Sequence, residues 1–116
     1  MTQEEKQLLF KDLCARLPYG VNFQGEDSNV YTLDAANYFA LQVEDVVFKP
    51  YLRSMSSMTE EEKDELLNLR KEMNMHMHPW IDRILDFYLS HHLDWRGLIL
   101  LGLALEAPEG MYKAKQ

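Results

Sequence analysis

The chain has 116 residues, of which 47% are hydrophobic, and its formal net charge is -7. This length and composition predict one folded domain and exclude a disordered tail, because the hydrophobic content is sufficient for a core. The negative charge argues against direct nucleic-acid binding, which needs a concentrated basic surface.

A first helix is predicted over residues 3–17. Thr2 and Glu5 have the spacing of a capping box, in which each residue bonds the backbone of the other. Apolar residues then recur at one helix face, from Phe10 to Leu17. The only cysteine, Cys14, lies on this face, so we expect a buried thiol, and no intramolecular disulfide can form.

Residues 21–48 predict a small antiparallel sheet of three or four strands. Residues 21–24 alternate and residues 30–33 are β-prone, and turn residues separate them, which is typical of a hairpin with a longer loop. Residues 38–43 and 46–48 are expected to supply further short strands. Residues 49–58 are expected to form a connector, because Pro50 cannot donate to a central ladder.

The rest of the chain predicts two or three helices packed on the sheet. Thr59 and Glu62 form a second capping box before a helix over 60–73, and Pro79 suits the first turn of a helix over 79–92. Asp94 and Gly102 have the positions of a cap and a stop for a short helix over 95–101, although a buried strand over 98–105 is the alternative. Residues 113–116 are expected to be frayed. Together these elements predict a single α+β domain over 1–116.

The histidines suggest a metal site. His76, His78, His91 and His92 offer imidazole ligands for zinc or copper, and neighbouring methionines offer thioether ligands for copper(I). An intact helix would separate the two pairs by roughly 20 Å at the usual rise per residue, so one protomer would not bring all four to one ion, whereas two protomers could. The simpler interpretation is that His91 and His92 interact favourably with the helix C-terminus. No other cofactor is predicted.

Partner binding is the function that the sequence favours. Aromatic and arginine side chains are typical of interface hot spots, and several lie in connectors or near element ends. These are Tyr51, Arg53, Trp95, Arg96 and Tyr112. The alternative for each is that it closes an edge of the core. The sequence contains no glycine-rich phosphate loop and no nucleophile elbow, so we expect a non-enzymatic interaction or accessory protein.

The partner itself is not identified by the sequence, and a homodimer is left open. The N-terminal residues lack an apolar signal-peptide core, and the apolar run over 97–105 is too short to span a bilayer. We therefore expect a cytoplasmic protein without a membrane partner.

Residues 49–62 and 97–112, together with the segments 2–6 and 17–21, carry a resemblance. They are similar to small uncharacterised proteins of Bacteroides-type gut bacteria, which are often encoded near phage or mobile elements. Ser54 stands where proline would be expected in such proteins. The resemblance implies a shared fold and a phage association, and it implies no catalytic residue, because no activity is established for these proteins.

Overall fold

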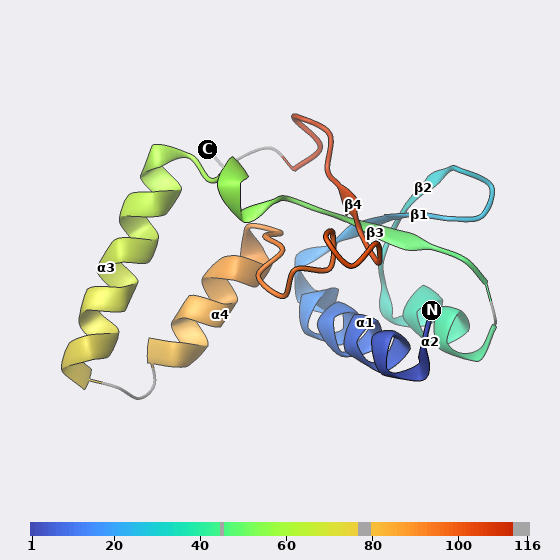
Figure 1. Ribbon diagram of the computed structural model, residues 1–116, viewed down its shortest axis with the longest axis horizontal. Helices are drawn as coiled ribbons and strands as arrows, with labels where there is room; N and C mark the ends of the chain where they lie inside the picture. The colour runs from blue at the N-terminus through green and yellow to red at the C-terminus, as the bar shows by residue number, and fades with distance from the viewer. Residues whose placement is uncertain (45, 77–79, 113–116) are drawn as a thin grey trace.

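The computed structural model describes residues 1–44, 46–76 and 80–112, and it has the mixed α+β fold predicted from the sequence. The helices and strands follow in the order α1 (Gln3–Arg16), β1 (Asn22–Gln24), β2 (Val30–Thr32), α2 (Ala35–Val43), β3 (Lys49–Leu52), α3 (Glu60–His76), α4 (Trp80–Ser90) and β4 (Leu105–Glu106). In Figure 1, α3 and α4 lie side by side at one end of the molecule, and α1, α2 and the sheet occupy the other end. No helix in the described part of the chain is long and apolar enough to cross a membrane.

Helix α1 begins with the capping box expected from the sequence. The Thr2 hydroxyl accepts a hydrogen bond from the Glu5 N–H at 3.0 Å, and the Glu5 carboxylate accepts one from the Thr2 N–H at 2.8 Å. The buried face of the helix is less apolar than predicted, because it includes Asp12 and Arg16. Cys14 is exposed, so the prediction of a buried thiol is wrong. The buried face of α1 includes Leu9, Leu13 and the fully buried Asp12–Arg16 pair, and Cys14 lies outside it.

The segment 35–43 is a helix, so the strand predicted over 38–43 is wrong. Asp34 accepts a hydrogen bond from the Asn37 N–H at 2.8 Å, and the Asn37 side chain accepts one from the Asp34 N–H at 2.7 Å. This local capping box starts α2. Over only nine residues, the spacing of the apolar side chains is compatible with both a helix and a strand, and the capping box favours the helix.

The sheet has four strands in the order β2-β1-β3-β4, and it is mixed rather than antiparallel. Strand β1 pairs antiparallel with β2 and β3, whereas β3 pairs parallel with β4. The predicted connector over 49–58 therefore begins with an inner strand, and the sheet is not confined to 21–48. Pro50 is tolerated in this inner strand because pairing with β4 begins only at Tyr51. The N–H group that proline lacks is therefore not needed for a hydrogen bond to β4.

The region over 95–104 consists of turns, so the short helix predicted over 95–101 is wrong. Asp94 does act as a cap, since its carboxylate accepts hydrogen bonds from the N–H groups of Leu98 and Ile99 at 2.8 and 2.9 Å. Gly97 and Gly102 then adopt positive φ angles of 78° and 77°, which prevents a regular helix from continuing. The alternative strand over 98–105 is also wrong, apart from its last residue, which begins β4.

Two apolar clusters stabilise the fold. The first joins α1, β1, α2 and β3 to the turns over 98–104, through residues such as Leu13, Leu52 and Leu98, all fully buried. The second lies between α3 and α4, where Leu66 packs with Phe87 and its neighbours. Helix α4, which belongs to the second cluster, also contacts α1, which belongs to the first.

Candidate functional site

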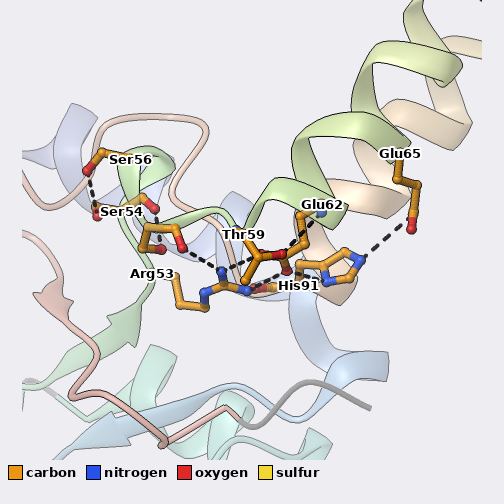
Figure 2. A network of polar contacts seen from close by, with 8 residues as sticks. Arg53, Ser54, Ser56, Thr59, Glu62, Glu65 and His91 are labelled. Carbon is orange, nitrogen blue, oxygen red and sulfur yellow. Dashed lines mark hydrogen bonds and ion pairs between the residues drawn. The ribbon is translucent and has the colours of Figure 1, made fainter. Parts of the chain in front are cut away.

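Arg53, which was predicted to bind a partner, makes several contacts within the protein. Its guanidinium donates to both carboxylate oxygens of Glu62 at 2.8 and 2.7 Å. It also donates to the backbone carbonyls of Ser57 at 3.1 Å and His91 at 3.2 Å. Figure 2 shows that these contacts join the end of β3 to the start of α3 and the end of α4.

Glu62 has two roles in this network. Its carboxylate accepts a hydrogen bond from the Thr59 N–H at 2.8 Å, and its own N–H donates to the Thr59 hydroxyl at 3.1 Å, which completes the capping box of α3. The hydrogen bonds from Arg53 lower the pKa of Glu62 to about 2, and the Thr59 N–H and the nearby His91 act in the same direction. Glu62 therefore remains ionised through the neutral and moderately acidic range.

His91 and His92 face different neighbours. The Nδ1 atom of His91 lies 2.9 Å from a Glu62 carboxylate oxygen, and its Nε2 atom lies 3.8 Å from one of Glu65. The His92 ring instead stacks on Tyr112 with 3.9 Å between ring centroids. Because these two histidines interact with different groups, the structure does not bring them together at one ion.

The other half of the predicted metal site is not described. His78 and the side chain of His76 lie outside the described residues. Within the described part, no group of three or more His, Cys, Asp and Glu residues is arranged to hold a metal ion. The zinc or copper site therefore stays a prediction.

Trp95 contacts α4, and Arg96 contacts α1. The Trp95 ring stacks on Tyr88 with a centroid distance of 6.2 Å and an interplanar angle of 14°. The Arg96 guanidinium lies 4.2 Å from the centroid of the Trp95 ring, and its Nε atom donates to Asp12 at 3.1 Å. Both side chains therefore have partners within the fold.

Asp12 and Arg16 form a fully buried ion pair that the sequence analysis missed. The Nε atom of Arg16 lies 2.6 Å from Asp12, and its Nη2 atom donates to the Leu93 carbonyl at 2.7 Å. Arg96 adds a second cation to the same carboxylate. The spacing of four residues on one helix was the available signal, but it is also typical of exposed pairs.

Tyr112 anchors the C-terminal segment to the sheet. Its hydroxyl donates to the Tyr51 carbonyl at 2.7 Å and accepts from the Asn22 N–H at 2.7 Å. Burial raises the pKa of Tyr112 to about 12. Of the five residues predicted for partner binding, Arg53 and Tyr112 line one hollow, while Tyr51 lies in β3, where its carbonyl accepts the hydrogen bond from Tyr112. Trp95 lies against α4, and Arg96 lies against α1.

A different hollow, of about 480 Å³, opens between α1, α2, residues 46–49 and the turn at 101–103. We call it the apolar hollow. Its floor is formed by core side chains that are only 1–8% exposed. These are Leu9, Phe10, Leu41, Phe48 and Leu103.

The rim of the apolar hollow carries exposed apolar side chains. Met1, Val47 and Leu101 line it and are 69%, 70% and 50% exposed. Leu100, next to this lining, is 94% exposed. The charged residues of the lining include two acids and two lysines: Glu5, Glu44, Lys6 and Lys49.

This rim was not predicted, because residues 46–48 were expected to form a strand, which they do not, and the apolar run after Asp94 was expected to form a short helix over 95–101 or a buried strand over 98–105. Hydrophobicity in a sequence predicts burial, so an apolar residue left uncovered gives no separate signal. No family model, curated protein or solved structure matches the chain.

Proposed function

We propose that this protein is a non-catalytic protein-interaction module that binds its partner at the apolar hollow. The observation that carries the proposal is the group of exposed apolar side chains around the rim of a hollow whose floor consists of core side chains. Scattered surface apolar residues are ordinary, but a group around a concave surface marks a binding site.

The energetic argument rests on the rim. Covering an exposed aliphatic side chain contributes about 1.5–3 kcal/mol, so Val47, Leu100 and Leu101 together offer a substantial contribution to binding. The rim segment is held in place, because the Val47 N–H donates to the Glu26 carboxylate at 2.9 Å. A surface fixed before binding loses less entropy when the partner docks.

The chemistry of the hollow indicates the kind of partner. Its apolar floor suits an aliphatic or aromatic anchor side chain, which is the usual centre of a protein interface. The acids and lysines of the lining would form the polar rim around that anchor. The net charge of -7 favours a protein partner over a nucleic acid.

The internal contacts of Arg53, Trp95, Arg96 and Tyr112 account for these side chains, so the proposal moves the binding surface to the apolar hollow. A cytoplasmic location is part of the same proposal. It is supported by the single exposed cysteine, since reduced thiols are typical of that compartment.

Site-specific photo-crosslinking in the source cells tests the proposal. A benzophenone amino acid replaces Leu101, which lines the hollow, or Leu67 on α3 as a control. The two positions are matched in exposure, at 50% and 51%. We expect discrete covalent adducts from position 101 only. Equal adducts from both positions, or none from position 101, would refute the proposal.

A further inference from the structure

We propose that the apolar hollow binds a second copy of this chain, with Leu100 of each copy inserted into the hollow of the other. This inference rests on the proposed function, because it names the partner of the same surface. Leu100 is the most exposed large apolar side chain in the described part of the chain, at 94%, and it directly precedes the lining residues 101–103.

The turn presents Leu100 on a rigid support. The Leu103 N–H donates to the Leu98 carbonyl at 3.0 Å, and the Gly102 N–H donates to the Ile99 carbonyl at 3.0 Å. Leu98 is fully buried, and the Asp94 carboxylate holds its N–H at 2.8 Å. A protruding side chain on a turn fixed in this way is already ordered before association, which is what a tight contact requires.

One surface therefore carries both a projecting side chain and a hollow. A two-fold symmetric interface uses the same patch on both subunits, so that each projection meets the partner's concave region. Leu100 adjoins the lining of the hollow in its own copy, so one patch holds both members of the proposed contact, and each Leu100 pairs with the hollow of the other copy. This pairing would cover the residue that is otherwise the most exposed.

Charge also favours this face for self-association. The chain carries a net charge of -7, so two copies repel each other when acidic faces meet. The first turns of α3 illustrate such a face, with Glu60, Glu61 and Asp64 exposed. The described lining of the hollow instead balances Glu5 and Glu44 against Lys6 and Lys49. A two-fold arrangement can then bring opposite charges together around the apolar centre.

Sedimentation equilibrium on the purified full chain, over micromolar to millimolar concentrations, tests the inference. We expect a reversible species of twice the 13.7 kDa chain mass. The variants Leu100→Asp and Val47→Asp should each raise the dimer dissociation constant by about a hundredfold or more, because a two-fold interface loses each contact twice. Leu67→Asp is the control, since it adds the same charge on α3, and it should leave the dimer unchanged.

At concentrations where the parent chain is also monomeric, thermal unfolding of each variant should match that of the parent, because Leu100 and Val47 are exposed. A chain that remains a 13.7 kDa monomer at every concentration would overturn the inference. A dimer that resists Leu100→Asp and Val47→Asp, or that dissociates equally with Leu67→Asp, would overturn it as well. A monomer whose position 101 forms adducts with a different protein would refute self-association and leave the proposed function intact. A monomer without adducts would refute both.

Discussion

Replacing Glu62 by glutamine should remove a pH-dependent part of the stability of the protein. In the folded chain Glu62 is ionised against Arg53, and its pKa is lowered from 4.5 to about 2. A carboxyl group with a lowered folded pKa contributes stability above its unfolded pKa. That contribution is lost as the pH falls from about 4.5 through about 2. Glutamine keeps the shape of the side chain but carries no charge.

The size of the effect follows from the pKa difference. At about 1.4 kcal/mol per pH unit, a fall from 4.5 to about 2 corresponds to about 3 kcal/mol. Solvent screening reduces this value little, because the Glu62 side chain is only 10% exposed. The same range is typical when one partner of a buried ion pair is removed and the other is left uncompensated.

Urea denaturation at a series of pH values measures the effect. At pH 7 we expect the free energy of unfolding of Glu62→Gln to be about 3 kcal/mol lower than that of the parent chain. The difference between the two proteins should narrow steadily as the pH is lowered from 4.5 towards 2. Glu61→Gln is the matched control in the same turn, where the side chain is exposed, and it should change stability by less than about 0.5 kcal/mol. A difference between Glu62→Gln and the parent that stays constant from pH 7 to pH 3 would refute the reasoning.

Three further outcomes follow from other contacts. Asp12→Ala should lower the free energy of unfolding by about 3–5 kcal/mol in urea denaturation, because it leaves the fully buried Arg16 without its carboxylate. Replacing both Asp12 and Arg16 by leucine should restore most of that loss, and a double variant as unstable as the single one would contradict this account. Tyr112→Phe should cost about 1–3 kcal/mol, since two backbone groups lose their partner. Ultraviolet titration should show that this variant lacks a tyrosine whose pKa is about 12. Gly102→Ala should cost about 1 kcal/mol by calorimetry, because φ is 77° there, whereas a neutral result would show that the turn relaxes.

The features that the sequence predicted best are those decided within a few residues. The capping boxes at Thr2 and Thr59 each join residues three positions apart, so the start of α1 and of α3 can be read locally. Asp34 capped a third helix by the same device, and its Asn37 partner is a weaker signal than glutamate. The mixed α+β class followed from these local patterns.

The features that the sequence did not predict depend on distant residues. Tyr51 pairs with Leu105 in the parallel ladder, and no local pattern relates two segments so far apart. Glu62 was predicted as a helix cap, but its bonds to Arg53 and its contact with His91 arise only when three elements meet. The apolar hollow was missed for the same reason, because exposure of Val47 and Leu100 depends on which segments fail to cover them.

The chain leaves the sheet and returns to it at a single point. The Arg53 N–H donates to the His92 carbonyl at 2.8 Å, and the Asp94 N–H donates to the Arg53 carbonyl at 2.8 Å. The whole α3–α4 hairpin therefore lies between two backbone positions that are hydrogen-bonded to each other. The β3–β4 ladder continues the sheet beside this junction, with Tyr51 paired to Leu105. The two helices of the hairpin are thus joined to the sheet through one backbone junction, and the contacts of Arg53 with Glu62 and of Trp95 with Tyr88 add side-chain connections beside it.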